Sequence, residues 1–228
     1  CDCRASVYPV DEKACLHIKQ TRYTVEELLR NPSLGKRYQG GYVWVLRLCV
    51  QDYHRYIYPD NAAESRRIRI PGILHTVNPV ANDAYPIYKE NSREYSLLKT
   101  ENFRTMLMME VGALFVGKIE NRPRMASVKR GEEKGNFAFG GSTIVLITEK
   151  NAVKPDEDIL KNSQAGMDTR VLMGENLRDS IQTMIDQIVD RTVDKYIADD
   201  TPVDNWDMIG FNEGIHEIIP LKGNFLIP

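Results

Sequence analysis

The amino-acid sequence predicts an α+β protein that is mainly β, with mixed or antiparallel sheets of short strands, a few helices and a C-terminal amphipathic helix. Runs rich in β-branched and aromatic residues dominate up to about residue 150, separated by Gly, Pro and Asn. Helical spacing of apolar residues becomes prominent only after Pro155. The 228 residues, 42% of them hydrophobic, are enough for one large domain with a buried core.

The first predicted helix begins after Thr24. The Thr24 hydroxyl can cap the first helical amides while Glu27 reaches back to complete a capping box, and Pro32 ends the helix soon after. Residues 42–50 predict a strand with one apolar face, formed by Trp44, Leu46, Leu48 and Val50. Further short strands are expected at 67–70, 95–98, 105–109, 114–119 and 143–148.

The predicted C-terminal helix is amphipathic. Its apolar residues recur at helical spacing, as Leu177, Ile181, Met184, Ile185, Ile188 and Thr192. Several Asp residues on its polar face favour packing on its own domain over binding to a membrane. No chemistry is assigned to the tail at 199–228.

Charge and cysteine content exclude some classes of function. Thirty basic and 32 acidic residues give a net charge of -2, so no overall attraction to nucleic acid is expected. The four cysteines form no C-x-x-C pair, which predicts reduced structural thiols and no metal site. No apolar run is long enough to span a membrane, and no signal segment is visible downstream of Cys1.

Four separated segments carry polar groups suited to catalysis, and their order is the main evidence. They are 9–11 with Asp11, 52–55 with His54, 72–79 with His75, and 129–143, which ends in Gly140-Gly141-Ser142-Thr143 before an apolar run. Each alone has a plain structural explanation, since Gly-Gly-Ser-Thr before a strand is typical of a turn. The combination in this order is far more specific.

These segments resemble the successive signatures of the phosphatidylserine decarboxylase family, together with 91–94, 111–113, 116–119 and the closing segment 171–175. The resemblance extends over about residues 7–177. It implies a catalytic domain at 1–177 and a helical appendage and tail at 178–228.

The resemblance implies that the chain makes its own cofactor. The Ser142 hydroxyl attacks the Gly141 carbonyl, the amide becomes an ester, and elimination with hydrolysis cuts the chain and leaves a pyruvoyl group at residue 142. Glycines at 140 and 141 leave the scissile carbonyl uncrowded. Asp11 matches the carboxylate that orients the base, and His54 matches a position associated with decarboxylation, where an imidazole can give a proton near neutral pH.

One departure from the family pattern affects the residue that acts as the general base for self-cleavage. The family has a second histidine three residues after the first, and Ile57 stands there. Isoleucine cannot take a proton, so His54 serves both steps or His75 approaches from the neighbouring segment. A structural explanation of His75, as a partly buried histidine bonded to backbone, competes with the second option.

The predicted function is therefore an enzyme that converts phosphatidylserine to phosphatidylethanolamine, or a related soluble amino acid to its amine. The alternative is an unprocessed pseudoenzyme that binds a lipid or a partner, which Ile57 favours and intact Ser142 opposes. By resemblance we also expect a homodimer and peripheral membrane contact. A cytoplasmic or membrane-associated location is expected.

Overall fold

The computed structural model describes residues 1–18, 21–49, 52–76, 86–113, 118–138 and 142–174. The chain divides into two units, residues 1–178 and 179–228, and every described residue belongs to the first. The helix expected from residue 177 onward therefore lies outside the described residues, and the predicted domain boundary stays a prediction.

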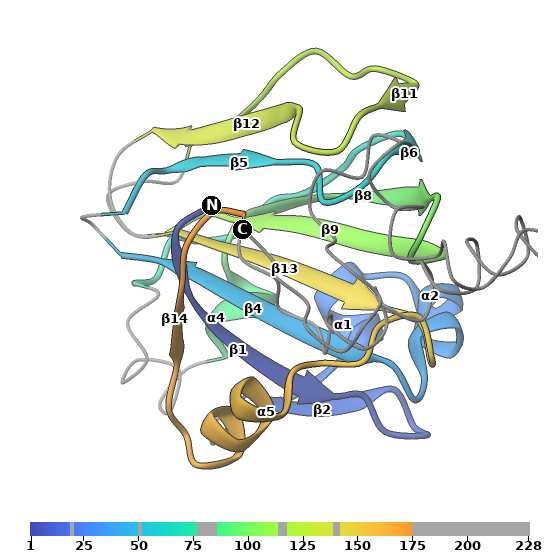
Figure 1. The fold of residues 1–228 in the computed structure, drawn as a ribbon, viewed down its shortest axis with the longest axis vertical. Helices are drawn as coiled ribbons and strands as arrows, with labels where there is room; N and C mark the ends of the chain where they lie inside the picture. The colour runs from blue at the N-terminus through green and yellow to red at the C-terminus, as the bar shows by residue number, and fades with distance from the viewer. Residues whose placement is uncertain (19–20, 50–51, 77–85, 114–117, 139–141, 175–228) are drawn as a thin grey trace, which may run out of the picture. The chain divides into compact units, whose positions relative to one another are not determined.

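A large antiparallel sheet organises the first unit (Figure 1). In the described part of the chain it has nine strands, and β7 (Ile68–Ile70) pairs with β8 beside the main order. That order is β11 (Ser127–Val128), β6 (Ala62–Glu64), β8 (Arg93–Thr100), β9 (Thr105–Val111), β13 (Ser142–Thr148), β4 (Tyr42–Leu48), β1 (Cys3–Pro9) and β14 (Thr169–Val171). The expected mainly β fold class is confirmed.

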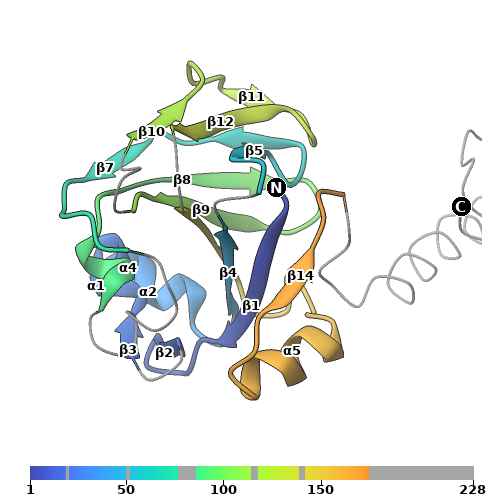
Figure 2. The ribbon, with the colours of Figure 1, turned by 90° about the vertical axis from the view of Figure 1, so that its left-hand side faces the viewer.

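A second sheet covers part of one face of the large one, as Figure 2 shows. It consists of β10 (Lys118–Asn121), β12 (Glu133–Ala138) and β5 (Arg55–Ile57). Tyr56 and Phe137 stack from β5 and β12 with ring centroids 5.0 Å apart, and they pack against Leu48 and Ile144 of the large sheet. Burial of these apolar side chains holds the two layers together.

Helices and a hairpin cover the opposite face (Figure 2). The hairpin is β2 (Cys15–Ile18) and β3 (Thr21–Thr24), and the helices are α1 (Val25–Leu29), α2 (Pro32–Tyr38) and α4 (Ile87–Glu90). The eight-residue helix α5 (Glu157–Gln164) packs against β1. Strand β4 is thereby buried on both faces, whereas its sequence predicted one apolar face, because Val43 and Val45 contact the helical layer while Leu46 and Leu48 contact the second sheet.

Several predicted elements are confirmed. Helix α1 begins after Thr24, whose side chain accepts a hydrogen bond from the Glu27 backbone, and Glu27 returns one to the Thr24 backbone. The strands expected at 95–98, 105–109 and 143–148 correspond to β8, β9 and β13. Of the strand expected at 114–119, only the part from Lys118 lies in the described residues. All four cysteines are free.

Among the helices in the described part of the chain, none combines the length and apolar character that crossing a bilayer requires.

Candidate active site

The start of β13 places residue 142 at one end of the large sheet. Ser142 pairs with Leu48, the last residue of β4, and Thr143 pairs with Val111, the last residue of β9. The backbone at Ser142 is therefore held from both sides by neighbouring strands. Gly141 lies outside the described residues, as does the side chain of Ser142.

His54 directly precedes β5, in the connection from β4. Strands β4 and β12 end at the side of the large sheet where β13 begins (Figure 1). A tight turn follows β4, in which the Cys49 amide donates to the Asp52 carboxylate at 2.6 Å. The His54 carbonyl then accepts a hydrogen bond of 2.9 Å from the amide of Phe137, and β12 ends one residue later, four residues before Ser142. Two connections that are far apart in the sequence thus bring His54 to the start of β13.

Hydrogen bonding fixes the tautomer of His54. Its Nδ1 lies 2.7 Å from the backbone oxygen of Asp52. Because a carbonyl oxygen only accepts, Nδ1 carries the hydrogen and Nε2 holds the lone pair. Nε2 is buried and has no hydrogen-bond partner among the described residues. An unpartnered buried nitrogen is costly, which marks it as an atom for proton transfer or ligand binding.

His75 approaches the same point from the other side. Fully buried Asn91 accepts a hydrogen bond from the His75 amide at 2.9 Å, and its Nδ2 donates to the carbonyls of His75 and Gly112, at 2.9 and 2.7 Å. Gly112 directly follows Val111, the partner of Thr143. Asn91 therefore clamps the His75 backbone to the end of the strand next to residue 142.

The His75 ring has a carboxylate partner. Its Nε2 lies 3.0 Å from Oε2 of Glu90, the last residue of α4, and the two side chains are about one third exposed. His75 is partly buried, as its structural explanation expected, and both its main chain and its ring contact side chains, those of Asn91 and Glu90. A carboxylate beside an imidazole orients the ring and stabilises its protonated form. This histidine-carboxylate pair was not predicted from the sequence.

Asp11 lies at the opposite end of the sheet. The β1–β4 ladder ends with Pro9 opposite Tyr42, and Tyr42 is six residues from Leu48, which is about 20 Å along a strand. The Asp11 carboxylate is exposed and accepts hydrogen bonds from the amides of Cys15 and Lys13, both at 2.8 Å. These bonds, that from Cys15 first, lower the pKa of Asp11. The fold does not bring Asp11 to Ser142, His54 or His75.

Ile57 ends β5 on the side away from the candidate site. It pairs with Glu133 at the start of β12, whereas Arg55 pairs with Asn136 near the end. His54, not residue 57, is therefore the position of this segment that adjoins residue 142.

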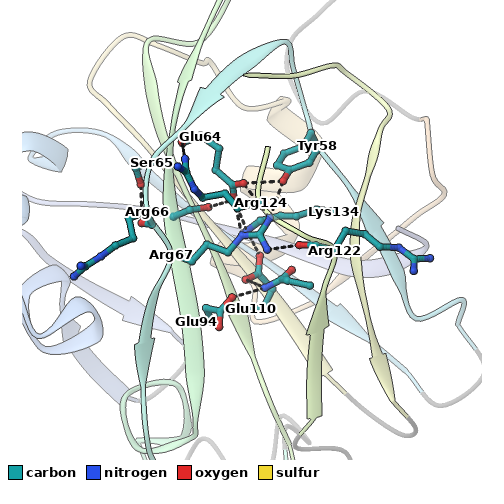
Figure 3. Close-up of polar contacts among 12 residues, drawn as sticks. Tyr58, Glu64, Ser65, Arg66, Arg67, Glu94, Glu110, Arg122, Arg124 and Lys134 are labelled. Atoms are coloured by element: carbon teal, nitrogen blue, oxygen red, sulfur yellow. Dashed lines mark hydrogen bonds and ion pairs between the residues drawn. The ribbon is translucent and has the colours of Figure 1, made fainter. Parts of the chain in front are cut away.

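Buried charges join the two sheet layers behind the site (Figure 3). Lys134 of β12 donates to Glu110 of β9 at 2.5 Å, and both side chains have no exposed surface. Glu64 lies 3.8 Å from Lys134 and is bound by Arg67 at 3.0 Å. Burial raises the pKa of Glu110 despite the neighbouring lysine. The sequence signal for this cluster was Glu110, a charged residue that directly follows the apolar run at residues 106–109 in β9.

Comparison with known proteins adds an independent finding. The sequence profile of one protein family, described as phosphatidylserine decarboxylase, matches residues 1–179. A Clostridium acetobutylicum protein named phosphatidylserine decarboxylase proenzyme 2 is 47% identical over 176 residues, which cover 77% of this chain and 60% of that protein.

Two further relatives are named phosphatidylserine decarboxylase proenzyme. One, from Clostridium botulinum, is 43% identical over 162 residues, which cover 70% of this chain and 55% of the relative. The other, from Ruminiclostridium cellulolyticum, is 42% identical over 174 residues, which cover 75% and 58%. The chain thus spans less than two thirds of the length of these relatives.

Proposed function

The chain belongs to the phosphatidylserine decarboxylase family, and we propose from this that it is a self-processing, pyruvoyl-dependent decarboxylase that converts phosphatidylserine to phosphatidylethanolamine. The observation that carries the proposal is the convergence of His54 and His75, from opposite sides, on the strand end that begins with Ser142. Two histidines that can transfer protons, His54 and His75, suit a pyruvoyl group formed at position 142. A pyruvoyl group there supplies a carbonyl that draws electrons from the bond to the departing carboxyl group.

We assign the base for self-cleavage to His75. A serine hydroxyl is a weak nucleophile until a base removes its proton, and the base becomes charged as it does so. Glu90, 3.0 Å from the His75 ring, stabilises that charge. His54 lacks such support, because its Nδ1 faces a backbone carbonyl and its Nε2 is buried without a partner in the part of the chain that the structure describes.

His54 is assigned to the decarboxylation step. Its tautomer presents Nε2 as the atom that exchanges a proton with bound substrate, and an imidazole does so near neutral pH. The hydrogen bond to Asp52 O holds the ring in place, so little reorganisation is needed. Asp11 has no role within one chain in this proposal, because about 20 Å of sheet separates it from residue 142.

A denaturing mass measurement tests the proposal. Two fragments that meet between Gly141 and Ser142, the second with a blocked amino end, are expected. A persistent chain of 26.1 kDa would support the pseudoenzyme instead. The Ser142→Ala protein should stay intact.

Substitution then separates the two histidines. His75→Ala should slow cleavage about 10²- to 10⁴-fold, and added imidazole should restore part of the rate. His54→Gln should cleave and then release no carbon dioxide from phosphatidylserine. His17→Ala is the matched control, because His17 is exposed on β2. Normal cleavage by His75→Ala would refute the assignment of the base.

A further inference from the structure

A pocket of about 420 Å³ lies beside the candidate active site, between the two sheet layers. Its lining residues come from β7, β8, β10 and the segment after β7, and they are Arg69, Leu74, Ser92, Glu94, Lys118 and Ile119. Leu74 precedes His75, and Ser92 follows the clamp residue Asn91. The pocket is therefore lined by sequence neighbours of His75, the histidine assigned as the base, and of Asn91, the residue that clamps it.

The strand register shows which charged residues of this pocket lie nearer to Ser142 and which lie farther from it. Arg69 pairs with Glu94, Glu94 with Glu110, and Glu110 with Ile144, so these four residues occupy one row on one face of the sheet. Ile144 is two residues after Ser142 on β13. A cation thus stands at the sheet edge, and a carboxylate stands between it and the site (Figure 3 labels Glu94 and Glu110).

Arg69 is the group of the pocket best suited to an anion. Within the described part of the chain its exposed guanidinium has neither an ion-pair nor a hydrogen-bond partner. Lys118 supplies a second cation from the other layer, although it also contacts Glu120 at 2.7 Å. Glu94 is held by Asn121 at 2.7 Å and repels an anion from the inner part of the pocket.

We propose that this pocket binds the phosphodiester of the substrate headgroup, with Arg69 as the residue that selects a phospholipid over a free amino acid. The inference rests on the proposed function and deepens it. Guanidinium binds phosphate through two parallel hydrogen bonds. The order of cation then carboxylate toward the site matches a headgroup in which the phosphate and the ammonium are a few bonds apart.

An exposed apolar side chain in the pocket wall points to a lipid. Leu74, which lines the pocket, is 38% exposed, and its neighbour Ile73 is 55% exposed, so these two residues form an apolar rim. Exposed apolar residues beside a polar pocket favour a ligand with a hydrocarbon part. Free serine has neither acyl chains for this rim nor a phosphate for Arg69, so it would leave both without a partner.

The test compares Arg69→Gln with Arg66→Gln, its exposed neighbour on the same segment, which does not line the pocket. Carbon dioxide release is measured with short-chain phosphatidylserine. Arg69→Gln should raise KM about tenfold to a hundredfold, the effect of losing hydrogen bonds to a charged group, with kcat changed less than twofold. Arg66→Gln should match the wild type. An unchanged KM in Arg69→Gln overturns the proposal.

A measurement of ligand binding tests the phosphodiester site separately from the proposed decarboxylase activity. Titration calorimetry with glycerophosphoserine and with serine is carried out on the purified protein, whether or not it has cleaved. We expect glycerophosphoserine to bind more tightly than serine, and Arg69→Gln to abolish that preference. If no carbon dioxide is released but this preference holds, the activity fails and the phosphodiester site stands. Equal binding of both compounds refutes the site, even in an active enzyme.

The apolar rim has its own readout. Leu74→Ser should weaken binding of dihexanoyl phosphatidylserine several-fold and leave glycerophosphoserine unaffected, because only the former carries acyl chains and Leu74 lines the pocket. Equal effects on both ligands would show that the rim does not contact the hydrocarbon part.

Discussion

The ion pair between Lys134 and Glu110 joins the two sheet layers through one pair of side chains. Removing one partner leaves a buried charge, so Lys134→Met should lower the free energy of unfolding by about 3–5 kcal/mol. The double variant Lys134→Met/Glu110→Leu should lose much less, since the carboxylate that stays behind, that of Glu64, is still bound by Arg67. Urea unfolding at neutral pH measures both. A double variant as unstable as the single one would contradict this account.

Glu64 gives the pH dependence of the same cluster. Burial raises the pKa of Glu64, but hydrogen bonds from Arg67 and Ser96 outweigh it, so the folded-state pKa lies below the ordinary 4.5. A lowered pKa stabilises the fold above pH 4.5, and that contribution is lost as the pH falls through the folded-state value.

We therefore expect the stability difference between the wild type and Glu64→Gln to be largest near neutral pH and to shrink below pH 4.5. Urea unfolding from pH 7 to pH 3 provides the measurement. A difference that stays constant over this range would show that Glu64 titrates alike in both states.

At the scale of residues, the sequence suggests candidate groups more readily than it places them. Ser142 and His54 were proposed from their motifs and His75 from its neighbouring segment, and the fold brings the three segments together. Glu90 was missed, because its meeting with the His75 ring depends on the Asn91 clamp. Asp11 was chosen by motif alone, and no local pattern reveals that strand register places it at the far end.

At the scale of elements, strands with regularly spaced apolar residues could be predicted from the sequence. A strand that contains charged residues and glycine could not. Strand β12 was missed because its sequence contains two charges and Gly135. That glycine is required by close approach, since a Cβ there would lie 2.6 Å from the Glu120 carbonyl oxygen and 2.8 Å from the Tyr56 hydroxyl. Buried Lys134 likewise makes sense only once Glu110 faces it.

Helix α1 depends on its capping box, which tests the local part of the prediction. Thr24→Ala should destabilise the fold by about 1 kcal/mol, because the Glu27 backbone amide loses its acceptor. Thr24→Ser keeps that acceptor and should cost only a few tenths of a kcal/mol. Thermal unfolding of both variants checks the difference. Similar losses in both would mean that the Thr24 methyl group matters more than the cap.

At the scale of the whole molecule, a substitution of Asp11 tests whether self-cleavage takes place within one chain or needs a second copy of the protein. Because about 20 Å of sheet separates it from residue 142, Asp11→Asn should self-cleave at the wild-type rate in dilute protein. The cleavage time course, followed by denaturing mass measurement at several protein concentrations, provides the check. A slow, concentration-dependent reaction would mean that a second copy delivers the carboxylate, as a homodimer would allow.

The position of β13 also predicts what happens to the cleaved molecule. Cleavage before Ser142 would leave β13 in the second fragment, yet it pairs on one side with β4 and on the other with β9, both of the first fragment. Strand β14 and helix α5 of the second fragment also pack on β1. The fragments should therefore co-elute in native gel filtration.

Denaturation should separate the two fragments without a reducing agent, because all four cysteines precede residue 50 and none lies in the second fragment. A non-reducing denaturing gel shows this directly. Loss of the smaller fragment during native gel filtration would mean that the central strand is not held by its neighbours. Retention under native conditions and release in denaturant would follow from backbone pairing and buried apolar contacts, the forces that hold β13 between β4 and β9.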